Sequence, residues 1–132
     1  MASVRDVMST ELVAVEPTAT IAEAATLMGE RRVGSALVLE GGRLVGILTE
    51  RDVLRALAAH FDAARQPVGE WMTPHPTTVR PEATVREALE LMLARGFRHL
   101  PVVEDDRVVG VVSIRDLSRA AIGPGAPGPV LR

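Results

Sequence analysis

Apolar residues recur every three or four positions in two stretches of the chain, and each stretch begins with the same signal. Apolar side chains stand at positions 21, 24, 25 and 28, and again at 85, 88, 89 and 92, which predicts two amphipathic helices. A Glu follows Thr20 and Thr84 by three residues, which is the pattern of a capping box at a helix start. We expect these helices to end near Arg32 and Gly96.

Each predicted helix is followed by two apolar runs with a short polar turn between them. Runs 36–39 and 44–48 flank Gly41 and Gly42, and the same arrangement surrounds Asp105 and Asp106 in the second half. A Gly-Gly turn allows positive φ at both central positions and predicts a β-hairpin, and Asp-Asp is a weaker form of the same signal. Near-continuous apolar strands also indicate a covered sheet with mixed pairing.

When the sequence is compared with itself at an offset of 64 residues, the two halves align without a gap. Residues 8–56 align with 72–120, and 19 of the 49 pairs are identical. Each copy has a short extended stretch, a helix, two strands and a second helix that starts at Thr49 or Ser113. We therefore predict an α/β (α+β) fold of two β-α-β-β-α repeats. The repeats should pack sheet to sheet about a pseudo-twofold axis, because one repeat alone cannot bury both faces of its sheet.

The repeat sets the expected domain boundaries within one globular module. The predicted segments are repeat 1, a linker, repeat 2 and a flexible Gly/Pro-rich tail, at residues 3–60, 61–67, 68–120 and 121–132. A chain of 132 residues is of ordinary size for one such module.

Composition removes several functional classes. All 15 basic residues are arginine, so there is no lysine for a Schiff base or a P-loop, and the absence of cysteine excludes thiol chemistry and thiolate metal sites. Few aromatic residues and a net charge of -2 argue against a nucleic-acid partner. No apolar run is long enough to span a membrane, and no signal peptide is evident. We therefore expect a cytoplasmic protein with neither a nucleic acid nor a membrane as its partner.

Five short motifs in fixed order carry a resemblance to a known family. Residues 7–9 (Val-Met-Ser) and 71–73 (Trp-Met-Thr) open the repeats, and 98–103 read Arg-His-Leu-Pro-Val-Val. Segments 45–52 and 109–116 share a hydrophobic–Gly–hydrophobic–hydrophobic–Thr/Ser–x–x–Asp ending. In this order the chain resembles a tandem pair of CBS domains, the family named after cystathionine β-synthase, over nearly its whole length.

The resemblance implies a stand-alone regulatory module. Such pairs bind AMP, ADP, ATP or S-adenosylmethionine in the clefts between their repeats, form disc-like homodimers and regulate another protein. We therefore expect a sensor that binds an adenosyl small molecule, signals by a change of shape and needs no obligatory cofactor. The alternative is a dimeric scaffold of the same fold that works without a ligand. The sequence shows no nucleophile–base pair and no metal cluster, so we do not expect an enzyme.

Two interpretations remain open for the duplicated strand-to-helix junctions. Thr49 and Ser113 are favoured N-cap residues, and Asp52 and Asp116 three positions later complement a helix dipole. A helix N-terminus is also an anion site. The resemblance assigns the two Asp residues to the ribose of the ligand, and Thr49 and Ser113 to its phosphate or ribose. A cap can also contact a ligand, so the two interpretations are compatible.

Repeat 2 carries the more complete set of candidate ligand residues. Arg98 and His99 precede a strand that contains Pro101, and they are either solvated loop residues or phosphate contacts. Pro101 lacks an N–H and should begin its strand or lie on a sheet edge. Arg115, between Ser113 and Asp116, either faces solvent or reaches a triphosphate or a partner subunit.

Repeat 1 departs from this pattern. It has Gly34 and Ser35 where repeat 2 has the basic pair, so its candidates are Thr49 and Asp52 with Arg32 and Arg51. If only one site works, we expect it to be that of repeat 2.

A glycine stands in the middle of one predicted strand in each repeat. Gly46 and Gly110 should weaken their strands, so each requires a local reason. A β-bulge would supply one, and so would the close approach of a helix or of an adenine ring.

Overall fold

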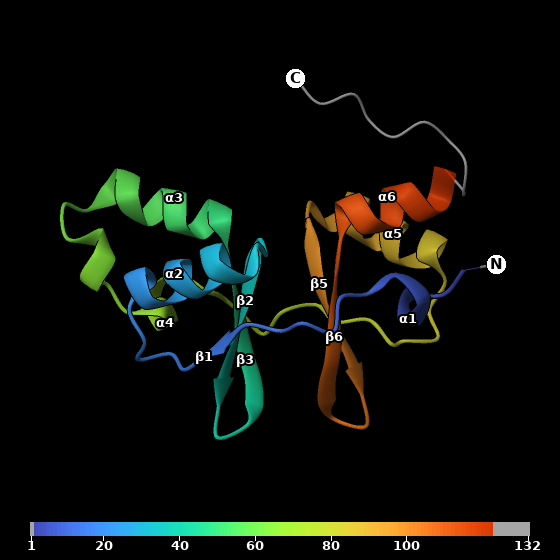
Figure 1. Cartoon of the computed structure of the whole chain (residues 1–132), viewed down its shortest axis with the longest axis horizontal. Coiled ribbons are helices and arrows are strands. Elements are labelled where there is room, and N and C mark those ends of the chain that lie inside the picture. The colour runs from blue at the N-terminus through green and yellow to red at the C-terminus, as the bar shows by residue number, and fades with distance from the viewer. Residues whose placement is uncertain (1, 123–132) are drawn as a thin grey trace. The chain divides into compact units, whose positions relative to one another are not determined.

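Helices and strands alternate in two compact units (Figure 1), in a computed structural model that describes residues 2–122. One unit is Glu11–Thr77, and the other combines Met1–Thr10 with Thr78–Arg132. The structure confirms the predicted mixed α/β fold built from two repeats. The predicted Gly/Pro-rich tail lies outside the described residues, except that the last helix reaches Ile122.

The unit Glu11–Thr77 is built on a four-stranded mixed sheet. Its elements in chain order are β1 (Ala14–Val15), α2 (Ile21–Arg31), β2 (Ser35–Glu40), β3 (Arg43–Thr49), α3 (Glu50–Ala59), the 3-10 helix η1 (Ala63–Arg65), α4 (Val68–Trp71) and β4 (Thr73–Pro74). The strand order is β1-β2-β3-β4. β1 is parallel to β2, and the other two pairings are antiparallel, as a mixed sheet was predicted to be.

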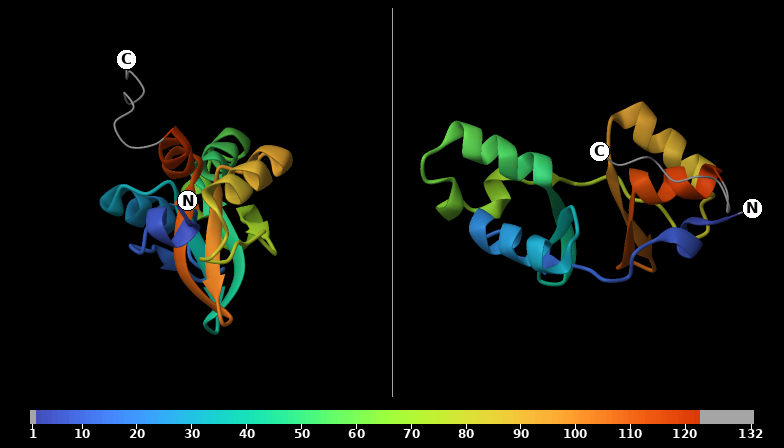
Figure 2. Two further views of the ribbon diagram at one scale, coloured as in Figure 1. Left: turned by 90° about the vertical axis from the view of Figure 1, so that its right-hand side faces the viewer. Right: turned by 45° about the horizontal axis from the view of Figure 1, so that its top comes forward.

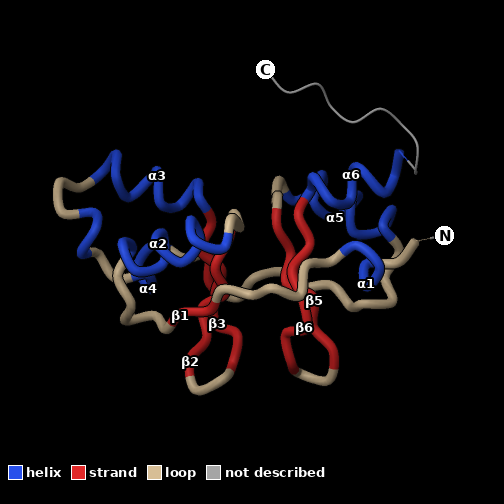
Figure 3. Tube along the Cα trace, viewed as in Figure 1, coloured by secondary structure: helices blue, strands red, loops and turns tan. Residues whose placement is uncertain are grey.

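The second unit repeats this plan around a two-stranded sheet. Its elements are α1 (Val4–Val7), α5 (Val85–Arg95), β5 (His99–Glu104), β6 (Arg107–Ser113) and α6 (Ile114–Ile122). In place of outer strands it has two single bridges, a parallel one between Val79 and Val102 and an antiparallel one between Ser9 and Val111. Figure 3 shows the resulting long hairpin of β5 and β6.

Pro101 accounts for part of this difference. In the first repeat, the backbone N–H of Leu37 donates to the Val13 carbonyl at 2.8 Å, which extends the pairing with β1. Pro101 stands at the position that matches Leu37 and has no N–H to donate. On that side of β5 the Pro101 carbonyl accepts a hydrogen bond from the N–H of Val79 at 3.0 Å. Pro101 thus lies inside the strand, on the edge that the sequence predicted, and not at the strand start.

The predicted helix signals are present, completely at α5 and in part at α2. The Thr84 hydroxyl accepts from the Glu87 N–H at 3.0 Å, and the Thr84 N–H donates to the Glu87 carboxylate at 3.2 Å, which completes a capping box. At α2 only half of the predicted box is present: the Thr20 hydroxyl accepts from the Glu23 N–H at 3.1 Å, and the Glu23 carboxylate accepts from the Thr20 hydroxyl and not from its backbone N–H. α2 is followed by Arg32 in the left-handed region at φ 56°, where α5 has Gly96 at φ 72°.

The helices of each unit cover one face of its hairpin, as Figures 1 and 2 show. In the first repeat, Ala36 and Val38 of β2 and Leu48 of β3 are buried in one apolar cluster with residues of α2, α3 and α4. The matching residues of β5 and β6 are buried with residues of α1, α5 and α6. Alternate side chains of each strand thus form the contact with the helices, because successive residues of a strand point to opposite faces.

Each sheet is completed by the segment that opens the other repeat in the sequence. The N–H of Val4 donates to the Ala83 carbonyl, and Ser9 exchanges two backbone hydrogen bonds with Val111. In the same way α4 and β4, which open the second repeat, pack on the first: the N–H of Val68 donates to Ala19, and β4 pairs with β3. The compact units therefore do not follow the sequence repeats.

The predicted β-bulge is present beside Gly46 and Gly110, and each glycine is also closely approached, although not by a helix. The register of β2 against β3 shifts between Val38 and Leu39, so that a bulge lies beside Gly46, and the same shift occurs beside Gly110. A Cβ atom on Gly46 would also stand 3.0 Å from the Thr73 carbonyl oxygen. This close approach is made not by a helix but by the opening segment of the other repeat, which we call the exchanged segment.

Candidate functional site

The candidate residues of the second repeat meet where β5 and β6 end and α6 begins. His99 and Ser113 are paired across the two strands, and the first N–H of α6, at Ile114, donates to the Arg98 carbonyl at 2.8 Å. Arg98 is exposed, and His99, Ser113 and Asp116 are partly buried. Four of the six predicted residues are thus brought to one strand-to-helix junction.

The other two lie beside this junction. Arg115 is exposed in the first turn of α6, next to Asp116. Pro101 is buried two residues further along β5 than His99, where its matching partner is Val111. Arg98 and Arg115 give the junction two cations at the positive end of a nine-residue helix, an arrangement that suits an anion.

The capping role predicted for Ser113 and Asp116 is present. The Asp116 N–H donates to the Ser113 hydroxyl at 3.1 Å, and that hydroxyl donates to Asp116 Oδ2 at 2.9 Å. Among the described residues, Asp116 Oδ1 accepts no hydrogen bond. This oxygen is therefore available to a hydroxyl group from outside the chain.

The first repeat builds the same junction without a counterpart of the Arg98–His99 pair. Ser35 pairs with Thr49, and the N–H of Glu50 donates to the Gly34 carbonyl at 3.2 Å. Arg51 is exposed in the first turn of α3, and Arg32 is exposed in the left-handed residue after α2. Gly34 and Ser35 thus occupy the places that Arg98 and His99 hold in the second repeat.

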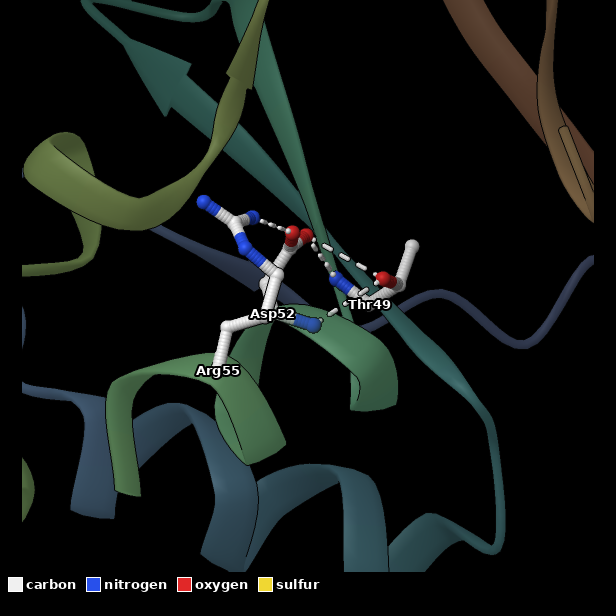
Figure 4. A network of polar contacts seen from close by, with 3 residues as sticks. All are labelled: Thr49, Asp52 and Arg55. Atoms are coloured by element: carbon white, nitrogen blue, oxygen red, sulfur yellow. Dashed lines mark hydrogen bonds and ion pairs between the residues drawn. The ribbon is translucent and has the colours of Figure 1, made fainter. Parts of the chain in front are cut away.

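Asp52 is the most buried ionisable side chain of this junction, and its carboxylate is largely occupied (Figure 4). Oδ2 accepts from the Thr49 N–H at 2.8 Å and from the Thr49 hydroxyl at 3.1 Å, which closes a capping box. Oδ1 accepts from Arg55 Nη1 at 2.7 Å. Figure 4 shows the Asp52 carboxylate between Thr49 on one side and the Arg55 guanidinium on the other.

Arg55 and Trp71 belong to this junction, although the sequence did not single them out as site residues. The Arg55 Cζ atom lies 5.6 Å from the centroid of the Trp71 ring, within the range of a cation–π interaction. His60, the residue that follows α3, meets the same ring edge-on at a centroid distance of 5.6 Å. The i,i+3 spacing of Asp52 and Arg55 on a helix was the available signal for the ion pair.

The described part of the chain contains no cluster of three or more His, Cys, Asp or Glu side chains that could hold a metal ion. Within residues 2–122, no helix has both the length and the apolar character needed to cross a bilayer.

The model of the CBS domain family matches the chain twice, at residues 4–59 and 68–123. The chain belongs to the CBS domain family. A 17.7 kDa uncharacterized protein of Acidianus ambivalens is 42% identical over 121 residues, which are 90% of this chain and 73% of that protein. The CBS domain-containing protein YhcV of Bacillus subtilis is 37% identical over 118 residues, covering 89% and 84% of the two chains.

Solved CBS structures have the same fold. The CBS-domain protein ATU1752 of Agrobacterium tumefaciens matches 91% of this chain and 99% of its own, with a TM-score of 0.85 and 31% identity. The CBS pair of MJ0100 in complex with 5′-methylthioadenosine and S-adenosylmethionine has a TM-score of 0.83 and 28% identity over 92% and 96% of the two chains. CBSX2 in complex with AMP has a TM-score of 0.82 and 27% identity over 96% and 100%.

Proposed function

We propose that this CBS pair is a regulatory module that binds an adenosyl ligand at the junction of β5, β6 and α6. The observation that carries the proposal is the state of Asp116, a partly buried carboxylate at a helix start with Oδ1 unoccupied by the described residues. A carboxylate in this position can accept hydrogen bonds from the two hydroxyls of a ribose. Relatives of the same fold that bind AMP or S-adenosylmethionine support an adenosyl group.

The groups around Asp116 would contact two different parts of the ligand, the ribose and the phosphate. Asp116 would hold the ribose, with Ser113 fixing the direction of the carboxylate. The side chains of Arg98 and Arg115, at the positive end of α6, would hold a phosphate, with His99 beside them. Because the chain has no lysine, arginine side chains supply the permanent cations of such a site.

Regulation requires that the ligand prefer one conformation of the chain. A ligand shifts a conformational equilibrium only by its difference in affinity for the two states. We propose that bound ligand biases the shape of the module in this way, and that the module acts on a separate protein.

Calorimetric titration with AMP, ATP and 5′-methylthioadenosine tests this proposal. Asp116→Asn should weaken all three ligands by about tenfold or more, since a hydrogen bond to a charged group contributes about 1.5–3 kcal/mol. Arg98→Gln should weaken AMP and ATP but leave 5′-methylthioadenosine, which has no phosphate, nearly unchanged. Arg80→Gln, an exposed arginine in the same unit, is the matched control. Failure of all three ligands to bind at millimolar concentration would overturn the proposal.

A ligand-independent scaffold is the second candidate, and one observation favours it. Leu54 and Leu57 on α3 are 66% and 60% exposed, and Phe61 just beyond the helix is fully exposed. Large apolar side chains grouped in this way are typical of a surface that contacts another protein. A homodimer formed through them would be seen by analytical ultracentrifugation as a dimer without nucleotide. A Leu54→Glu variant should then be monomeric, and a wild-type monomer would exclude this candidate.

A further inference from the structure

The two matching carboxylates, Asp52 and Asp116, differ in how many hydrogen bonds they already accept. Asp52 accepts three, two from Thr49 and one from Arg55. Asp116 accepts one from Ser113 and no other from the described residues. An ionised carboxylate has about four lone-pair positions, so about one remains on Asp52 and about three on Asp116. A ribose diol needs two.

The guanidinium of Arg55 is held in place from two sides. Its Nη1 atom donates to Asp52 Oδ1 at 2.7 Å, and its Cζ atom lies 5.6 Å from the Trp71 ring centroid. The Asp52 side chain is only 7% exposed, so the carboxylate end of this ion pair is shielded from water. A charge-assisted hydrogen bond to a shielded carboxylate is stronger than an ordinary surface pair.

The other compact unit, which contains Asp116, has the matching arginine but lacks the ring. Arg119 stands at the position that matches Arg55, and Val7 stands where the unit Glu11–Thr77 has Trp71. Arg119 is exposed and forms no ion pair with Asp116 within the described part of the chain. A valine offers no π face to a guanidinium, so nothing equivalent to Trp71 directs Arg119 toward the carboxylate.

We propose that Arg55, held by Trp71, blocks the Asp52 carboxylate, so that the chain binds one adenosyl ligand at Asp116 and none at Asp52. This inference rests on the proposed function. It makes Arg55 a residue that sets the number of ligands bound, and it assigns the difference between the repeats to one aromatic side chain in the exchanged segment.

Calorimetric titration with AMP tests the block by counting sites. The wild-type chain should bind one AMP per chain, and Arg55→Gln should bind two. The second site should disappear again in Arg55→Gln/Asp52→Asn. Arg119→Gln is the matched control and should still bind one. Trp71→Leu provides a second route, because it releases Arg55 without changing the Asp52 carboxylate, and it should also gain a site. Circular dichroism of each variant verifies that it is folded.

The outcomes separate the block from the proposed function. A wild-type chain that binds a second AMP molecule would contradict the proposed block at Asp52 but not the proposed sensor function. A folded Arg55→Gln variant that still binds only one AMP would do the same. If neither the wild-type chain nor any variant binds AMP, ATP or 5′-methylthioadenosine, both proposals fail together.

Discussion

Met72 lies against Gly46, and its Cγ atom is 2.9 Å from the point where a Cβ atom on Gly46 would stand. Met8 and Gly110 have the same relationship in the other unit, also at 2.9 Å. Each methionine belongs to the opening segment of one repeat, and each glycine lies in a strand of the other repeat. The contacts among these four residues therefore show that each repeat's opening segment packs on a strand of the other repeat.

Alanine at Gly46 should destabilise the unit Glu11–Thr77 by about 1–3 kcal/mol, because an extra methyl group would overpack this contact. Adding Met72→Ala to Gly46→Ala should return part of that loss, while adding Met8→Ala should not. Urea unfolding of the single and double variants measures the coupling. Equal rescue by both methionine variants would contradict the pairing of Gly46 with Met72.

Truncation of Val4 or Val68 should weaken the repeat that the residue packs on, and not the repeat in which it stands in the sequence. Both side chains are fully buried, so Val→Ala should cost about 1–3 kcal/mol. Hydrogen exchange measured by mass spectrometry should show faster exchange in β6 and α6 for Val4→Ala. For Val68→Ala the faster exchange should be in β3 and α3. The opposite distribution would show that the opening segments are not exchanged in solution.

Gly29→Ala should stabilise the protein by about 0.5–1 kcal/mol. Gly29 lies inside α2, and a Cβ atom there would meet nothing within 4 Å, so the helix propensity of alanine is gained without a clash. Gly96→Ala is the contrasting control, because its φ of 72° disfavours any residue with a Cβ atom. Thermal unfolding should show a higher Tm for the first variant and a lower Tm for the second.

Asp6 should titrate below its ordinary value. A hydrogen bond from the Ser3 backbone N–H to the Asp6 carboxylate is the main cause that lowers its pKa from 3.8, and the Ser3 hydroxyl adds to it. Since the folded-state pKa is depressed, the contribution of Asp6 to stability is present above pH 3.8 and is lost as pH falls through the lower folded-state pKa. NMR titration of the carboxyl carbon measures this. In Ser3→Ala the pKa should rise but stay below 3.8, because the backbone donor remains.

Local signals predicted most of the regular structure. The Thr20 and Thr84 caps and the glycine turn act through neighbours within four residues, so the sequence shows them directly. The short helices α1 and α4 were missed, because four residues are too few to display a period. Their exchange between repeats was missed as well, because a local sequence pattern does not show which distant segments pair with each other.

In the candidate site, too, local sequence predicts one part and only the tertiary structure shows the other. The strand-to-helix junctions with Asp52 and Asp116 follow from spacing along one segment. The occupation of Asp52 by Arg55 depends on Trp71, which comes from another part of the chain. Repeat identity alone therefore predicts two equal junctions, and only the tertiary structure shows that they differ.

The exchanged segments also bear on how such a chain could have arisen by duplication. In this chain the opening segment of each repeat completes the sheet of the other copy. A one-repeat ancestor with this same exchange would have completed its fold by pairing with a second identical molecule. Gene fusion would then have converted an intermolecular association into an intramolecular one, which no longer depends on protein concentration.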